Sequence, residues 1–245
     1  MIYDSNFEIV GPNYKLGASK HFSTDNDSSI IFSHGLEGDK DGSKWMEWSN
    51  FLPAKGFNVL RFNYRGCGKN TEQPSDGDFF DTTLSSRVFD YELVLNSLSD
   101  FGLDDFQLGA IGSSFGGMVI AASANPKLKA IALVATPFSL DFDLGEDVPS
   151  GTLELESGEF LSGEFLKDIA LYDIGKKLQQ YNIPTIIIHG SKDEIVPVAH
   201  AYKLYDSINA PRELHIIEGA DHSLTNSSHR DEAIQLITQW MLKYL

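Results

Sequence analysis

Short, continuously apolar runs alternate with segments of helical periodicity along most of this chain. An apolar run bounded by turn residues is typical of a strand that is buried on both faces, as in a parallel sheet. Two further runs, at residues 7–10 and 14–22, flank a Gly-Pro-Asn turn and predict an antiparallel hairpin. The buried strands are expected at residues 29–33, 57–64, 106–112, 128–135, 183–189 and 212–217.

Amphipathic patterns separate these runs and predict helices at residues 43–55, 81–98, 198–209 and 231–245, with another after residue 112. We expect Ser43 to cap the first of these helices and Gly56 to end it. Strands that alternate with helices predict an α/β fold, with a mostly parallel sheet covered by helices on both faces. Residues 1–245 are therefore expected to form a single domain.

The alternation is interrupted at residues 138–170, which we predict to be a lid insertion. Residues 138–168 hold nine acidic side chains against one basic side chain, Lys167. Residues 152–156 alternate in polarity, Ser157 and Gly158 favour a turn, and residues 159–162 complete a predicted hairpin. We expect apolar side chains of this segment to roof a pocket that takes neutral acyl groups and rejects carboxylates, because no cation is foreseen there. The alternative is a solvated excursion without a role. The expected roof consists of Leu153, Leu155, Phe160, Leu161 and Phe165.

Composition narrows the classes of function. The 245 residues are 42% hydrophobic and 22% charged, which is ordinary for a globular protein, and their net charge is −16. This charge argues against nucleic acids and anionic membranes as partners. The single cysteine, Cys67, excludes an intrachain disulfide and suggests no cysteine-based metal site. With no signal peptide and no transmembrane run foreseen, the expected localisation is cytoplasmic.

A strand-to-helix junction carries the first candidate chemistry. The sequence Gly112-Ser-Ser-Phe-Gly116 fits the G-x-S-x-G pattern of a nucleophile elbow, in which a tight turn exposes the central serine, Ser114. A Cβ atom two residues before or after that serine would strike a neighbouring strand or helix. The pattern alone is weak evidence for a nucleophile, because a glycine-rich turn whose serine has no catalytic role can have the same sequence.

Two more residues complete a candidate triad. Asp193 and His222 each follow a predicted strand, and the carboxyl ends of parallel strands share one edge of a sheet. The order Ser, Asp, His is the one used by α/β-hydrolases. His222 is predicted to take the proton of Ser114, and Asp193 to orient the imidazole. The competing acids, Glu194 and Asp221, are expected to point elsewhere or to lie too close in sequence to His222.

The main-chain N–H groups of Leu36 and Phe115 are the candidate oxyanion donors. Leu36 follows the His34-Gly35 pair at the end of a buried strand, and Phe115 opens the helix behind Ser114. The alternative for residues 34–38 is a plain glycine turn. Cys67 is interpreted as a small turn residue rather than a nucleophile.

From about Ile30 onward the chain resembles the α/β-hydrolase superfamily, and within it the small bacterial feruloyl and cinnamoyl esterases. The resemblance implies an eight-stranded sheet with a compact lid, and it places the nucleophile, acid and base on Ser114, Asp193 and His222. In that family the elbow often reads Gly-His-Ser-Gln-Gly, so Phe115 is a departure. The motifs that carry the resemblance lie at residues 33–40, 75–79, 83–84, 112–116, 189–197 and 219–222.

The sequence therefore predicts a serine carboxylic-ester hydrolase that works through an acyl-enzyme on small neutral or apolar, including aromatic, acyl esters. It is expected to need no cofactor or metal, to take a small-molecule ester as its partner, and to be a monomer or homodimer. An amide, peptide or thioester hydrolase with the same triad stays open, because the acyl-transfer machinery is shared. A non-catalytic ligand-binding protein on the same scaffold is the alternative from another class.

Overall fold

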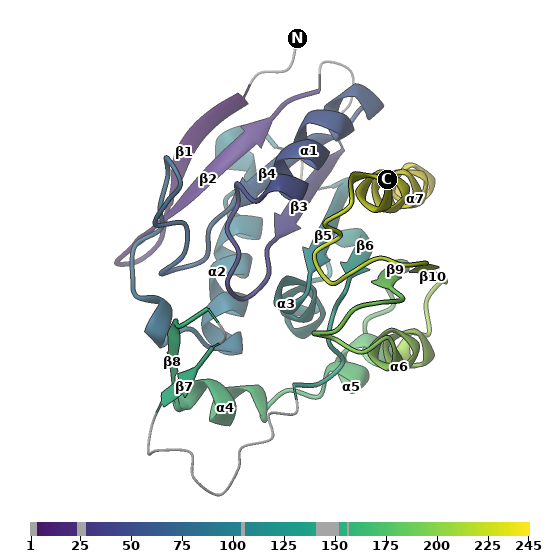
Figure 1. Ribbon diagram of the computed structural model, residues 1–245. Coiled ribbons are helices and arrows are strands. Elements are labelled where there is room, and N and C mark those ends of the chain that lie inside the picture. Colours follow the sequence, from purple (N-terminus) through teal and green to yellow (C-terminus); the bar gives the residue numbers. More distant parts are fainter. Residues whose placement is uncertain (1–3, 24–27, 104–105, 141–151, 156) are drawn as a thin grey trace, which may run out of the picture.

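The apolar runs assemble into one eight-stranded sheet (Figure 1). The computed structural model describes residues 4–23, 28–103, 106–140, 152–155 and 157–245. The strand order is β1-β2-β4-β3-β5-β6-β9-β10. The strands are β1 (Asp4–Val10), β2 (Lys15–His21), β3 (Ser29–Ser33), β4 (Asn58–Phe62), β5 (Leu108–Ser113), β6 (Leu128–Val134), β9 (Thr185–Gly190) and β10 (Arg212–Ile217).

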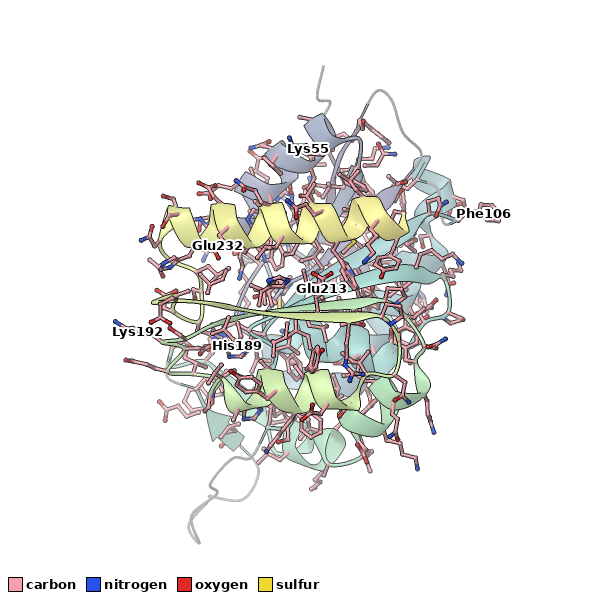
Figure 2. The ribbon with its side chains drawn as sticks, turned by 90° about the vertical axis from the view of Figure 1, so that its right-hand side faces the viewer. Lys55, Phe106, His189, Lys192, Glu213 and Glu232 are labelled. Carbon is pink, nitrogen blue, oxygen red and sulfur yellow. The ribbon has the colours of Figure 1, made fainter. Side chains whose placement is uncertain are left out.

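Strand direction decides where the functional loops meet. The predicted hairpin β1–β2 is antiparallel and β2 is antiparallel to β4, whereas the remaining neighbours are parallel. The loops that leave β3, β5, β9 and β10 therefore emerge at the same edge of the sheet. Figure 2 shows this edge on the left, where His189 and Lys192 lie, while Phe106, just before β5, lies at the opposite end.

Helices cover both faces, as predicted. Trp48 and Ile234 belong to the core on the face covered by α1 (Ser43–Phe51) and α7 (Ser227–Tyr244). Tyr91 and Met118 belong to the core on the other face. In Figure 2, α7 and α6 lie on opposite sides of β10. The second face is covered by α2 (Leu84–Asn96), α3 (Phe115–Ser123), α5 (Ile174–Gln180) and α6 (Ala199–Ser207).

Several helix ends differ from the predictions because of local capping. Gly42, and not Ser43, is the N-cap of α1, whereas Gly56 ends the helical segment in the left-handed region as expected. The predicted helix at 81–98 begins only at Leu84, because Thr83 forms a capping box with Ser86. Short 3-10 turns flank it at Phe79–Asp81 and Leu98–Phe101, and another at Leu52–Lys55 follows α1.

The predicted hairpin is present in the insertion, as β7 (Thr152–Glu154) and β8 (Phe160–Ser162), and α4 (Glu164–Ile169) follows it. Residues 141–151 and 156 of the predicted lid lie outside the described residues. The expectation that Phe160 turns inward is wrong, since its side chain is 46% exposed. Leu161 is fully buried, and neighbouring strand residues point to opposite faces, so Phe160 points outward. In Figure 1 the hairpin and α4 lie beside one end of α2, away from the sheet.

Among the helices of the described residues, none is both long enough and apolar enough to cross a membrane.

Candidate active site

Ser114 lies at the sharp turn between β5 and α3. Its backbone angles are φ 54° and ψ −127°, a strained conformation for a residue other than glycine. The Ser114 N–H donates a hydrogen bond to the Val134 carbonyl at 2.8 Å, which ties the turn to the neighbouring strand. Strain of this kind persists only where the surroundings fix the backbone, and it holds the side chain above the sheet edge.

The two glycines of the elbow are needed for space, as the sequence predicts. A Cβ atom on Gly112 would lie 2.5 Å from the Gly117 Cα, and one on Gly116 would lie 2.1 Å from the Ser33 carbonyl oxygen. Both distances are far below van der Waals contact. The glycine before Ser114 therefore lets α3 approach β5, and the glycine after it lets α3 approach β3.

Asp193 and His222 are brought together by the loops after β9 and β10. The His222 Nδ1 atom lies 2.8 Å from the Asp193 Oδ2 atom. The Asp193 side chain is fully buried, whereas the His222 side chain keeps 14% of its surface exposed. An imidazole held at Nδ1 by a carboxylate leaves Nε2 free to accept a proton.

The Asp193 carboxylate has further donors. His189 Nε2 lies 3.2 Å from Oδ2, and the Val196 N–H donates to Oδ1 at 2.7 Å. Burial acts to raise the pKa of Asp193, but the hydrogen bonds from His189, His222 and Val196 outweigh it and hold the pKa well below its usual range. Asp193 is therefore ionised across the physiological range.

The competing acids lie elsewhere. Glu194 is exposed to solvent. The Asp221 Oδ1 atom accepts the Thr225 N–H at 2.8 Å, so this carboxylate holds its own turn. Of these acids, only Asp193 bonds the imidazole of His222 in the described structure.

Ser114 and His222 line one cavity of about 760 Å³, together with the predicted oxyanion residues Leu36 and Phe115. Asp193 lies behind His222, outside the lining. The structure thus gathers the five predicted site residues at one edge of the sheet. Further lining residues from the β9–α6 loop and its helix, which the sequence did not suggest, are Ile195, Val196, Pro197 and His200.

The loop after β3 approaches the nucleophile through Gly35. A Cβ atom placed on Gly35 would lie 3.4 Å from the Ser114 Cβ. The Gly35 carbonyl receives a hydrogen bond from Arg87 Nη1 at 3.0 Å and lies 2.8 Å from His34 Nδ1. The Tyr64 N–H donates to His34 Nε2 at 3.3 Å, so Nδ1 carries the ring proton and donates to Gly35. Burial and the nearby Arg87 charge lower the pKa of His34 to about 3, which keeps the ring neutral.

The model of the prolyl oligopeptidase family (Peptidase_S9) matches residues 44–245. The chain belongs to this family. The solved structures that it resembles also confirm the predicted likeness to α/β-hydrolases and to small esterases.

Relatives of this family member by sequence include the uncharacterized protein YfhR of Escherichia coli, 29% identical over 202 residues, which cover 80% of this chain and 63% of YfhR. YitV of Bacillus subtilis, named as a candidate esterase, is 27% identical over 237 residues, 88% of this chain and 89% of YitV. The mitochondrial palmitoyl-protein thioesterase ABHD10 of Rattus norvegicus is 29% identical over 201 residues, 74% of this chain and 64% of that protein. The matches to YfhR and ABHD10 thus span under two thirds of their length.

Solved structures share the fold of this prolyl oligopeptidase family member. Est1E from Butyrivibrio proteoclasticus with bound ferulic acid has a TM-score of 0.84 at 22% identity, covering 97% of this chain and 98% of Est1E. Mouse alpha/beta hydrolase domain-containing protein 10 has a TM-score of 0.81 at 20% identity, covering 98% of this chain and 99% of that one. At these identities the likeness establishes the fold.

Arg87 is a residue of this family member's site that sequence reasoning missed. Its side chain is buried, bonds the carbonyls of Gly35 and Leu36, and lies against the rings of Tyr64 and Phe115. The signal was present, because Arg87 falls on the apolar stripe of a helix between Leu84 and Tyr91. A charged residue on such a stripe needs buried partners.

Cys67 belongs to the same buried group and is not a nucleophile candidate. Its Sγ atom lies 3.4 Å from Arg87 Nη2. Burial raises the pKa of the Cys67 thiol, so it stays protonated and unreactive at neutral pH.

Lys44 overturns one prediction about the pocket of this family member. No cation was expected beside the acyl site, yet Lys44 is the one lysine or arginine among the described residues that line the cavity. Lys44 Nζ donates to the Ser113 Oγ at 2.7 Å. The expectation failed because Lys44 lies on α1, far in sequence from the segment predicted to form the pocket roof.

A second, smaller cavity of about 370 Å³ adjoins the first and shares Ser139 and Leu140 with it. Its other lining residues are mostly apolar and include Met118 of α3 and Leu166 and Ile169 of α4. Within the described part of the insertion of this family member, α4 thus lines the second cavity, whereas the predicted Phe160 lines neither cavity.

Proposed function

We propose that this protein is a serine hydrolase that cleaves carboxylic esters through an acyl-enzyme. The observation that carries the proposal is the convergence of Ser114, at a positive φ, and a His222 held by a buried Asp193 on one 760 Å³ cavity. The strained conformation of Ser114 and the burial of the Asp193 carboxylate serve no structural purpose that would require Ser114, Asp193 and His222 to lie together.

Acylation begins when the Ser114 Oγ attacks the carbonyl carbon of the ester. His222 Nε2 takes the hydroxyl proton as the new C–O bond forms, and the electron pair of the carbonyl moves onto its oxygen. Collapse of this tetrahedral intermediate expels the alcohol, which receives the proton from His222. Asp193 stabilises the imidazolium between the two steps.

Deacylation repeats these steps with water in place of Ser114. His222 takes a proton from the water, the hydroxide adds to the acyl carbon, and Ser114 leaves with the proton returned from His222. The products are a carboxylic acid and an alcohol.

The negative oxygen of each intermediate is assigned to the N–H groups of Leu36 and Phe115. The C=O of Gly35 and the N–H of Leu36 belong to one planar trans peptide, so they point in opposite directions. By holding the Gly35 carbonyl from behind, Arg87 and His34 orient the Leu36 N–H toward the cavity. Arg87 is in this account a positioning residue that prepares the oxyanion site before substrate arrives.

We assign the insertion the role of a lid that selects the acyl group. The apolar cavity of about 370 Å³ under α4 suits an acyl chain or ring of moderate size. The name of the rat relative, a palmitoyl-protein thioesterase, suggests thioesters as the second candidate substrate class. The adjoining apolar cavity favours acyl thioesters over peptides as substrates.

The test is a panel of p-nitrophenyl esters from acetate to octanoate, run beside an acyl thioester, methyl ferulate and an aminoacyl anilide. The proposal expects hydrolysis of esters, with an initial burst of p-nitrophenol equal to the enzyme present. Ser114→Ala should retain the fold by circular dichroism and lose about a million-fold in kcat. Absence of ester hydrolysis in the wild type, or its persistence in Ser114→Ala, would end the proposal.

A further inference from the structure

Lys44 places a positive charge in the wall of the catalytic cavity. Its Nζ atom is 2.7 Å from the Oγ of Ser113, the residue that directly precedes the nucleophile. Consecutive Cα atoms are about 3.8 Å apart, so the ammonium lies within reach of a substrate whose carbonyl is bound at Ser114. The Lys44 side chain also lies over the rings of Trp45 and Trp48, at 5.3 Å and 5.9 Å from their centroids.

No carboxylate forms an ion pair with Lys44 within the described part of the chain. The two acids in the cavity lining have partners of their own. Glu37 accepts a hydrogen bond from Ser157, and Asp39 accepts the Asp41 N–H at 2.8 Å. A half-buried ammonium with one neutral hydroxyl partner and two rings is under-solvated, so an anion entering the cavity would gain by pairing with it.

The charge persists at neutral pH. Burial lowers the pKa of Lys44 to about 8, with Arg230 acting in the same direction and Asp221 and Asp193 opposing it. The side chain is therefore mostly protonated at pH 7 and mostly neutral above pH 9. The first turn of α1, from Ser43, lines the same wall, and the positive end of a helix adds to the attraction for anions.

We infer that Lys44 is a specificity residue for esters that carry a carboxylate, which its ammonium pairs with while Ser114 attacks the ester carbonyl. The inference rests on the proposed function and adds a substrate class to it, since the sequence predicted that carboxylates are rejected. The carboxylate can belong to the acyl part or to the alcohol part of the ester, and both sources share this chemistry.

Two matched pairs of esters separate these sources. Monoethyl glutarate and ethyl pentanoate differ by a carboxylate on the acyl side, and hydrolysis is followed by acid release at constant pH. 4-Acetoxybenzoate and its methyl ester differ by a carboxylate on the alcohol side. For each pair the measured quantity is the ratio of kcat/KM for the anionic ester over the neutral one, after division by the alkaline hydrolysis rates.

In at least one pair, Lys44→Met should lower this ratio about tenfold or more, which is the loss expected for one charge-assisted contact. Lys44→Arg should keep the ratio, because it keeps the charge. Lys55→Met is the matched control, since it removes an exposed lysine near the end of the same helical segment without touching the cavity. Raising the pH from 7 to 9.5 should lower the wild-type ratio toward that of Lys44→Met.

An unchanged ratio in Lys44→Met, or an equal loss for both members of each pair, would show that Lys44 only supports Ser113 and would overturn the inference. In that outcome hydrolysis of neutral esters by the wild type would leave the proposed function standing. If the wild type hydrolyses neither member of either pair, the inference fails, and the proposed function fails with it only if the p-nitrophenyl esters are not hydrolysed either.

Discussion

The elbow and the insertion are held in place in different ways. At the elbow, Gly112 and Gly116 allow main chains to approach so closely that a single added carbon would collide with backbone. In the insertion, two three-residue strands and a six-residue helix rest on the domain through buried side chains such as Leu161 and Phe165. Hydrogen bonds also attach the insertion to the domain, including one that the Ser85 N–H donates to Asp168 Oδ2 at 2.8 Å.

This difference separates chemistry from selectivity. Backbone packed to contact cannot drift, so the proposed nucleophile and the proposed oxyanion donors would keep the geometry that catalysis needs. A small element held by side chains can be reshaped by substitution without disturbing the sheet. We therefore expect changes near the elbow to lower kcat for every substrate, and changes in the insertion to alter the order of substrates.

The largest effect among the following predictions concerns Asp193, the proposed acid of the triad. Asp193→Asn should lower kcat about ten-thousand-fold, because an amide at this position favours the wrong tautomer of His222. Stopped-flow kinetics with p-nitrophenyl acetate would measure this loss. Glu194→Gln and Asp221→Asn, which neutralise neighbouring acids, are the controls and should stay within about tenfold of the wild type. If Glu194→Gln proved the crippling change, the acid would be misassigned.

A smaller effect is expected at Arg87, which we propose acts through the Gly35–Leu36 peptide. Arg87→Met should lower kcat about a hundred-fold, which approaches the loss of one oxyanion donor, and should change KM little. Arg87→Lys should recover part of the rate by restoring one hydrogen bond.

Affinity for an aliphatic boronic acid, which mimics the tetrahedral intermediate, gives the deciding comparison. A positioning role predicts that Arg87→Met weakens boronic-acid binding by about the same factor as kcat. Equal weakening of substrate and boronic-acid binding, or a loss of rate that merely follows a lower unfolding temperature, would assign Arg87 to stability alone.

The smallest effect is expected in the insertion, where Phe165 and Phe160 form a matched pair. Phe165 is fully buried with its ring 5.6 Å from that of Phe115, whereas Phe160 is 46% exposed. Phe165→Ala should shift kcat/KM between butyrate and octanoate esters by about tenfold, and Phe160→Ala by less than about twofold. Equal changes for all acyl lengths would make Phe165 a folding residue and would contradict selection by the lid.

Much of this architecture could be predicted because its signals are local. The buried strands are continuous apolar runs, and Ser114 stands inside a pentapeptide whose glycines are required by contacts to Gly117 and Ser33. Asp193 and His222 each follow a strand directly, so the parallel sheet alone brings their loops to one edge.

Arg87 and Lys44 could not be placed in the same way. Each lies on a helix and is brought to the site by the packing of that helix against other elements. The role of each residue therefore depends on distances between elements, which cannot be deduced from spacing in the sequence. Phe160 was placed wrongly because the expected roof included both Phe160 and Leu161, whereas consecutive strand residues point to opposite faces and the short hairpin offers little pattern to show which of the two is buried. The short helices α4 and α5 likewise have no strong periodicity.

The central claim is that the Ser114 Oγ atom forms the covalent bond of the acyl-enzyme. Covalent trapping tests this claim most directly. A p-nitrophenyl alkylphosphonate should react once per chain, release one p-nitrophenol, and leave its phosphorus on the Ser114 Oγ, as located by fragmentation mass spectrometry of the peptide. Ser113→Ala, which alters the neighbouring hydroxyl, should still be labelled on Ser114, and Ser114→Ala should not be labelled. A phosphonate on Ser113 or on another residue, with ester hydrolysis retained in Ser114→Ala, would contradict the account.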